Sequence, residues 1–158
     1  MAPMPLLVAL GYLLGDLVPG EAFQCRRDHR GWRWAGQADA LGLLLDDRSP
    51  VPSSEVAVLE LCVSAEVTPV RELAGLPSRR VGVAQPVPDL VDSRAHVVAF
   101  MRAARRAMVS VAAAREVHVL MAIPNSLAVE FGRLQLPKSH PPCTCGNATM
   151  PADQTALC

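Results

Sequence analysis

Aromatic side chains and lysine are scarce in this sequence, and neither sign of charge is in excess. Phe, Trp and Tyr make up 4% of the 158 residues, and the only lysine is Lys138. The formal net charge at pH 7 is zero, so charge gives no indication of a nucleic-acid or membrane partner. Because 51% of the residues are hydrophobic, the chain can still bury a core, and its length predicts one domain.

The sequence also lacks the motifs of the common catalytic sites. It has no Walker A motif, no G-x-G-x-x-G, no G-x-S-x-G and no H-E-x-x-H. The four histidines are scattered without ligand spacing, and Asp46-Asp47 is an acidic pair without partners. We therefore expect no catalytic residue, no metal and no cofactor, and we interpret the chain as a binding module, not an enzyme.

No apolar run indicates a membrane span, and the cysteines do not indicate a disulfide scaffold. The run 5–14 is shorter than the roughly twenty residues that cross a bilayer, and no Lys or Arg precedes it. A cleaved signal peptide is the less favoured alternative to a helix of the domain. Cys143 and Cys145 form a C-x-C, whereas structural zinc sites typically use C-x2-C.

A twelve-residue segment occurs twice. Residues 2–13 (APMPLLVALGYL) and 123–134 (IPNSLAVEFGRL) match without gaps at five of twelve positions. Each copy has a proline and then a helical pattern with a glycine inside it, Gly11 or Gly132. A glycine inside a helix costs about 1 kcal/mol relative to alanine, which favours a close approach to a neighbouring backbone at both places. Coincidence between two leucine-rich helices is the alternative.

Helical and strand-like patterns alternate along the chain. We expect helices at 5–14, 68–73, 93–114 and 125–135, and strands at 22–26, 55–63, 81–85 and 117–121. Helices that alternate with β-branched runs predict an α/β fold with a largely parallel sheet. From Lys138 onward there is no periodic pattern, so we expect a domain over 1–138 and an irregular, disordered tail over 139–158.

Polar residues directly after two buried strands are the first candidates for a ligand site. Asn125 and Ser126 begin the helix after strand 117–121, and Ser64 follows strand 55–63. A helix N-terminus at the carboxyl end of a parallel strand favours anions, and ligands of open α/β sheets bind outside these ends. The alternative is that Asn125 and Ser126 only cap the helix.

Trp32 and Trp34 are weaker candidates. If they lie on a strand, their rings point to the same side and could stack on nucleotide bases. Core packing is the commoner role of tryptophan. Arg102, Arg105 and Arg106 lie off the apolar stripe of helix 93–114. They would suit phosphates too, but we interpret their face as solvated.

Three stretches of the sequence resemble the SAVED domain: 2–34, 56–68 and 118–138, of which IPNSLAVEFGRLQLPK at 123–138 is the most specific. SAVED domains resemble two fused CARF-like Rossmann units, so the resemblance implies a Rossmann-like, pseudo-duplicated fold. It also implies a cytoplasmic sensor of a cyclic oligonucleotide second messenger in CBASS-type bacterial anti-phage defence. Such a sensor controls a fused effector domain and forms homo-oligomers on ligand binding, without a membrane or direct DNA contact.

The chain departs from the family pattern at both ends. The strand expected before Pro3 and the effector are absent, and after Lys138 a Cys/Pro/Thr-rich tail stands where the family continues with a strand. These departures predict a truncated domain, incomplete at the N-terminus. Two alternatives to a sensor stay open: a remnant of a Rossmann-type nucleotide-binding enzyme, and a non-functional truncated product.

Overall fold

A computed structural model describes residues 3–15, 19–23, 31, 34, 41–45, 54–135 and 143–147. In these residues, five strands form one sheet in the order β1-β3-β2-β4-β5. The elements, in chain order, are α1 (Met4–Leu14), β1 (Leu43–Leu45), β2 (Val56–Cys62), β3 (Ser78–Val83), α2 (Arg94–Ser110), β4 (Glu116–Ala122), α3 (Asn125–Arg133) and β5 (Cys143–Asn147). Strands β3, β2, β4 and β5 run parallel, and β1 pairs with β3 in antiparallel fashion. The predicted α/β fold with a largely parallel sheet is confirmed.

The two central strands, β2 and β4, are buried on both faces. Leu59 and Val119 have no exposed surface on one face, and Val58 is 1% exposed on the other. Continuous apolar runs of this kind are typical of the inner strands of parallel sheets, which are covered on both sides. The predicted buried strands at 55–63 and 117–121 are therefore confirmed.

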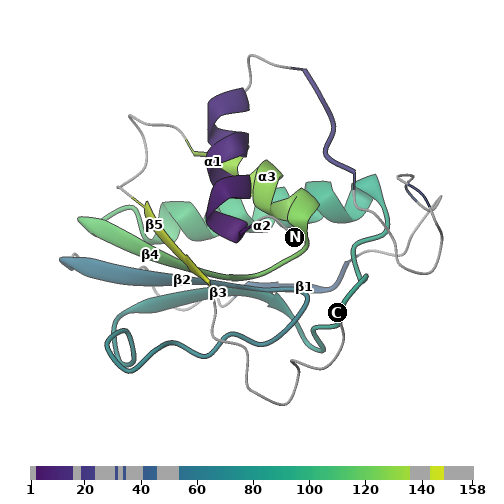
Figure 1. Ribbon diagram of the computed structural model, residues 1–158. Helices are drawn as coiled ribbons and strands as arrows, with labels where there is room; N and C mark the ends of the chain where they lie inside the picture. The colour runs from purple at the N-terminus through teal and green to yellow at the C-terminus, as the bar shows by residue number, and fades with distance from the viewer. Residues whose placement is uncertain are drawn as a thin grey trace.

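All three helices lie on the same face of the sheet (Figure 1). Phe100 of α2 and Phe131 of α3 are fully buried in the core between helices and sheet. Helix α2 begins after Ser93, whose side chain accepts a hydrogen bond from the backbone N–H of His96 at 3.2 Å. This N-cap satisfies one of the backbone donors that the start of a helix leaves without a partner.

Helices α1 and α3 pack against each other at two glycines. A Cβ atom at Gly11 would lie 1.9 Å from the carbonyl oxygen of Val129, and one at Gly132 would lie 2.1 Å from that of Val8. Val8 and Val129 occupy equivalent positions in the two copies of the twelve-residue segment, so the contact is reciprocal. Both glycines therefore do what the sequence predicted: each permits a close approach to a neighbouring backbone.

The two helices also begin in the same way. Pro3 is the N-cap of α1 with φ −59° and ψ 137°, and Pro124 is the N-cap of α3 with φ −61° and ψ 153°. Neither N-cap makes a side-chain hydrogen bond to its helix. The equivalent prolines thus set equivalent backbone geometry at the starts of α1 and α3.

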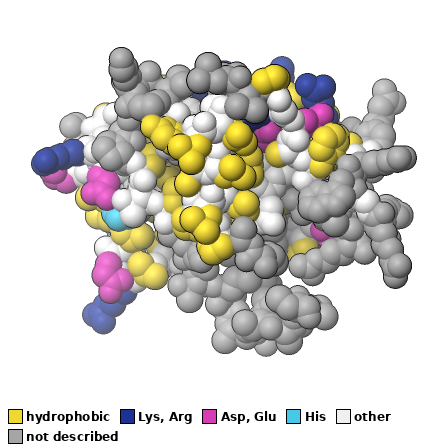
Figure 2. Space-filling model, turned by 45° about the horizontal axis from the view of Figure 1, so that its top comes forward, with side chains coloured by type: hydrophobic (Ala, Val, Ile, Leu, Met, Phe, Trp, Pro, Cys, Tyr) yellow, Lys and Arg dark blue, Asp and Glu magenta, His cyan; other side chains and the backbone are white. Residues whose placement is uncertain are grey.

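Helix α1 exposes the apolar surface that its counterpart buries. Three leucines of α1 are between 46% and 79% exposed: Leu6, Leu10 and Leu13. The residues at the equivalent positions of the second copy are at most 7% exposed: Leu127 and Phe131 of α3, and its C-cap residue Leu134. Figure 2 shows hydrophobic side chains gathered near the middle of the face that comes forward in that view.

Residues 68–73 do not form the helix that the sequence predicted. Residues 68–70 have no regular structure and 71–75 form turns, in which the backbone N–H of Ala74 donates to the carbonyl of Val70 at 3.0 Å. Gly75 follows with a φ of 87°, a left-handed conformation that ends any helical continuation. The predicted strand 22–26 is not formed at Ala22 and Phe23, and the rest of that range lies outside the described residues.

Residues 143–147 form β5, although the sequence predicted an irregular tail over 139–158. β5 pairs in parallel with β4, and Cys143 lies opposite Val117. Cys143 and Cys145 are half-buried against the core, whereas Thr144 between them is exposed. The C-T-C alternation is thus a short strand pattern in which cysteine acts as a small hydrophobic residue. The prediction of an irregular tail is wrong for these five residues.

Candidate ligand-binding site

Ser64 and the start of α3 lie at the carboxyl edge of the parallel strands. The backbone N–H groups of Val63 and Ser64 both donate to the carbonyl oxygen of Ala122, at 3.0 and 2.8 Å. These two hydrogen bonds tie the chain after β2 to the last residue of β4. Because Asn125 follows Ala122 by only three residues, the structure places Ser64 and the start of α3 at one edge, as the sequence predicted.

Asn125 and Ser126 lie in the first turn of α3. The N-cap residue is Pro124, which makes no side-chain hydrogen bond to the helix. Asn125 is the first helical residue and is half-buried, while Ser126 is 3% exposed. The first N–H groups of a helix have no acceptor within it, and the helix dipole adds positive potential there. The start of α3 therefore has the positive potential that any helix N-terminus supplies.

Trp34 is held in place by two neighbours from the segment before it. Its indole Nε1–H donates to a carboxylate oxygen of Glu21 at 2.9 Å, and its ring lies 5.6 Å from that of Phe23, centroid to centroid. The side chain is half-buried and packs against the core. Trp32 lies outside the described residues, so the prediction that both rings cover one surface stays a prediction.

A groove with a volume of about 700 Å³ runs along α2 beside Trp34. Residues 20–22 and Trp34 form one wall, α2 forms the other, and Glu130 of α3 also lines it. The α2 wall combines apolar residues, such as Val98 and Met101, with arginines. Four arginines line the groove: Arg94, Arg102, Arg105 and Arg106. This volume is in the range of about 300–1,000 Å³ that is usual for small-molecule sites.

Sequence reasoning missed this groove. It noted that Arg102, Arg105 and Arg106 suit phosphates but preferred a solvated helix face, and it did not place Trp34 beside them. Nothing local in the sequence places residues 20–22 and Trp34 beside α2. The one available signal was the spacing of three arginines at i, i+3 and i+4, which puts them on one side of a helix.

Among the described residues, Cys62, Cys143 and Cys145 form no disulfide, and burial shields their thiols. Burial raises the pKa of Cys62 and of Cys143, and it raises the pKa of Cys145 to about 11. A thiol with a raised pKa holds little thiolate at neutral pH and is a poor nucleophile. In the described ranges, no group of three or more His, Cys, Asp or Glu side chains is placed to hold a metal ion. The helices there are too short or too polar to span a bilayer.

Comparison with known proteins gives a family and a fold. The model of the SAVED family, the SMODS-associated and fused to various effectors sensor domain, matches residues 1–145. No curated protein matches the chain.

Two solved structures of the Cap4 SAVED/CARF-domain containing receptor of Acinetobacter baumannii are similar to this chain. The first, with the cyclic trinucleotide 2′3′3′-cAAA, has a TM-score of 0.62 and 14% identity. The second, with the cyclic trinucleotide 3′3′3′-cAAA, has a TM-score of 0.62 and 15% identity. Each match covers 91% of this chain but 33% of the receptor, so this chain spans about one third of the receptor's length. Since the family model matches most of the residues and the fold is that of a SAVED/CARF receptor, the chain belongs to the SAVED family of sensor domains.

Proposed function

We propose that this chain is a cytoplasmic sensor module that binds a cyclic oligonucleotide second messenger in CBASS-type bacterial anti-phage defence. The module is not an enzyme; in the whole protein it controls an effector domain, and ligand binding promotes homo-oligomer assembly. The observation that carries the proposal is the SAVED match over residues 1–145. Solved relatives of the same fold with cyclic trinucleotides support it.

The carboxyl edge of the sheet is the proposed place for the phosphates. Asn125 is half-buried and supplies amide donors, and Ser64 is half-buried on the neighbouring strand end. Ser126 is buried, so it contributes through its backbone N–H in the first turn of α3 and not through an exposed hydroxyl. Donors of this kind bind phosphate oxygens without reading the base.

The bases of the ligand need flat or apolar partners. Trp34 is the described candidate, because Glu21 and Phe23 fix its ring beside a groove of ligand size. Trp32 is proposed as a second stacking residue on the sequence pattern alone. Stacking of a base on an aromatic ring contributes about 1–3 kcal/mol, and it tolerates different bases.

A pseudo-duplicated, CARF-like architecture is part of the proposal. The reciprocal glycine contacts, the matching N-cap prolines and the equivalent apolar faces of α1 and α3 support a pseudo-twofold relation between two units. Such symmetry suits a cyclic ligand that repeats one nucleotide around a ring.

Isothermal titration of the purified chain tests the proposal. The panel contains cyclic di-, tri- and tetranucleotides, including 2′3′3′-cAAA and 3′3′3′-cAAA, with linear tri-adenylate and AMP as controls. A sensor binds at least one cyclic compound at least tenfold more tightly than the linear controls. An enzyme remnant of Rossmann type prefers the mononucleotide, and a non-functional product binds none. Either of these two results contradicts the proposal.

A further inference from the structure

We propose that the ligand site continues from the carboxyl edge into the groove along α2, where Arg102, Arg105 and Arg106 contact the phosphates of the cyclic oligonucleotide. This inference rests on the proposed function. It favours phosphate binding over a solvated face, the two alternatives that the sequence offered for these three arginines.

The first support is the charge balance of the groove. Glu21 accepts the Trp34 indole N–H and lies 3.6 Å from Nε of Arg94, while Glu130 lies 3.8 Å from Nη1 of Arg133. Both acidic residues of the lining are therefore engaged by other groups. Arg102, Arg105 and Arg106 make no ion pair with any residue in the described ranges. The groove carries positive charge that the described part of the chain does not neutralise.

The second support is the spacing of the three guanidinium groups. Arg102 and Arg106 are four residues apart on α2, and Arg102 and Arg105 are three apart, so the side chains are neighbours on one side of the helix. Like charges at this spacing destabilise a helix. Bound phosphates remove this repulsion, and the planar fork of arginine matches phosphate oxygens with two parallel hydrogen bonds.

The third support is the apolar surface between the charges. Val98 is 42% exposed, and Met101 is half-buried beside it. Trp34 forms the facing wall with a ring that its neighbours hold in one orientation. The apolar surface of Val98 and Met101 and the fixed ring of Trp34 suit a base. The arginines suit the phosphates that join the nucleotides.

The groove and the proposed edge site both include residues of α3. Glu130 lines the groove and lies five residues after Asn125 on α3, which is about 7.5 Å along the helix axis. One ligand of several nucleotides can therefore reach both places. An acidic protein partner is less suitable, because specific protein interfaces bury about 800 Å² on each side, more than a small groove supplies.

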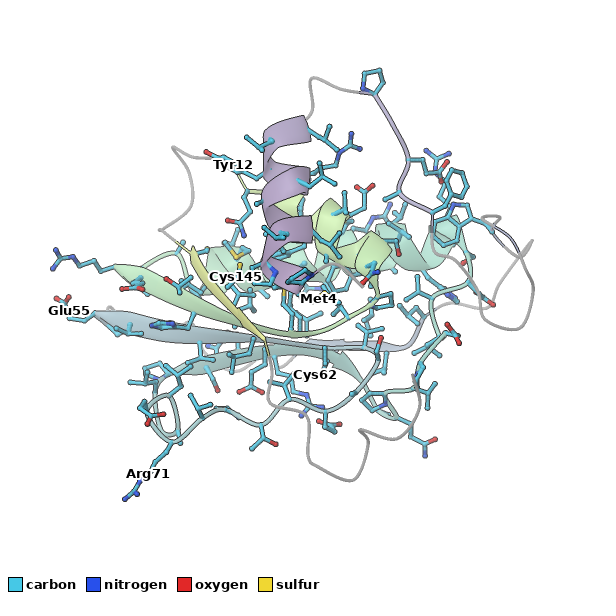
Figure 3. All side chains as sticks on the ribbon, viewed as in Figure 1. Met4, Tyr12, Glu55, Cys62, Arg71 and Cys145 are labelled. Carbon is cyan, nitrogen blue, oxygen red and sulfur yellow. The ribbon has the colours of Figure 1, made fainter. Side chains whose placement is uncertain are left out.

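The test compares two double variants that remove the same charge. Arg102→Gln/Arg106→Gln empties the groove of two guanidinium groups that are exposed, so folding should be unaffected. The control is Arg71→Gln/Arg115→Gln: Arg71 points away from the molecule on the side of the sheet opposite the helices (Figure 3), and Arg115 is 82% exposed beside Glu55. The probe is the cyclic oligonucleotide of the panel that binds the wild-type chain most tightly.

We expect the groove variant to bind this probe at least tenfold more weakly and the control variant to stay within twofold of wild type. Affinity of the wild type falls between 50 and 300 mM NaCl, and this salt dependence is reduced in the groove variant. Arg102→Lys/Arg106→Lys, which keeps the charge but loses the fork, gives an intermediate affinity.

Each other outcome overturns the inference. If the wild type binds a cyclic oligonucleotide and the groove variant binds it within threefold, the arginines do not form the site and the proposed function stands. If the control variant weakens binding as much as the groove variant, the effect is one of overall charge. If the wild type binds no cyclic oligonucleotide, the proposed function and this inference fail together.

Discussion

Replacement of Gly132 by alanine should force α1 and α3 apart. The new Cβ would lie 2.1 Å from the carbonyl oxygen of Val8 and 2.9 Å from the backbone nitrogen of Tyr12. Both neighbours are backbone atoms of a helix, so they cannot rotate away as the end of a side chain would. The helices must therefore separate or bend. The further they move apart, the more of the packing of α1 on α3 is lost.

The size of the effect follows from two opposing terms. Alanine favours the helical conformation by about 1 kcal/mol relative to glycine. Overpacking of a tight contact costs about 1–3 kcal/mol, and a rigid backbone neighbour places this contact at the upper end. We therefore expect the free energy of unfolding to fall by about 2 kcal/mol. With a urea dependence of about 2 kcal/mol per molar, the midpoint of unfolding should fall by about 1 M.

Urea denaturation followed by circular dichroism measures this change. Gly42→Ala is the control, because no heavy atom lies within 4 Å of a Cβ at that position, and its free energy of unfolding should change by less than about 0.5 kcal/mol. Gly11→Ala should match Gly132→Ala, and the double variant should cost less than the sum, since the first substitution already separates the helices. A Gly132→Ala chain as stable as wild type would refute the close packing of α1 on α3.

Three further outcomes are expected from the core, the start of α2 and the buried thiols. Phe100→Ala removes a fully buried ring and should lower the free energy of unfolding by about 3–5 kcal/mol, measured in urea. Ser93→Ala removes the N-cap bond to His96 and should cost about 1 kcal/mol, whereas Ser93→Asp should keep most of it. Because burial raises the pKa of Cys145 from 9.0 to about 11, the folded chain keeps a proton that the unfolded chain loses in this range. Its contribution to stability is complete below pH 9 and is lost as the pH rises towards 11. The urea midpoint should therefore fall over this window in wild type and fall less in Cys145→Ala.

The elements that the sequence predicted well carry a strong local pattern. β2 and β4 are continuous apolar runs, and α2 has a regular apolar stripe with a serine N-cap. Their boundaries differ from the prediction by one to a few residues, because helix and strand ends depend on single hydrogen bonds such as that from His96 to Ser93.

The elements that the sequence missed depend on non-local contacts. β1 is three leucines long and exists through its antiparallel pairing with β3, with Leu43 opposite Val83. β5 is held by its pairing with β4 and by two half-buried cysteines. Its polar residues obscured the alternation of buried and exposed side chains that predicts a strand. At 68–73 the structure has irregular backbone followed by turns where the sequence predicted a helix, and a pattern of six residues is too short to separate the two.

The candidate site divides in the same way. The sequence placed Ser64 and Asn125 at one edge, because the carboxyl ends of neighbouring parallel strands always meet there. It could not place Trp34 beside the arginines of α2, since the two segments meet only through tertiary packing. The side chain of Ser126 was expected to contact the ligand. Because Ser126 is buried, only its backbone N–H is proposed for that contact.

The most direct test of the central claim is amide hydrogen exchange with and without a saturating cyclic trinucleotide. We predict that exchange slows at two places: the first turn of α3 with residues 63–64, and the α2 wall of the groove from Arg94 to Arg106. The amino-end edge of the same strands, at Glu55 and Glu116, should be unaffected, because it lies at the other end of the sheet. Unchanged exchange at Asn125–Leu127 with saturating ligand, or protection confined to the amino-end edge, would contradict the proposed site.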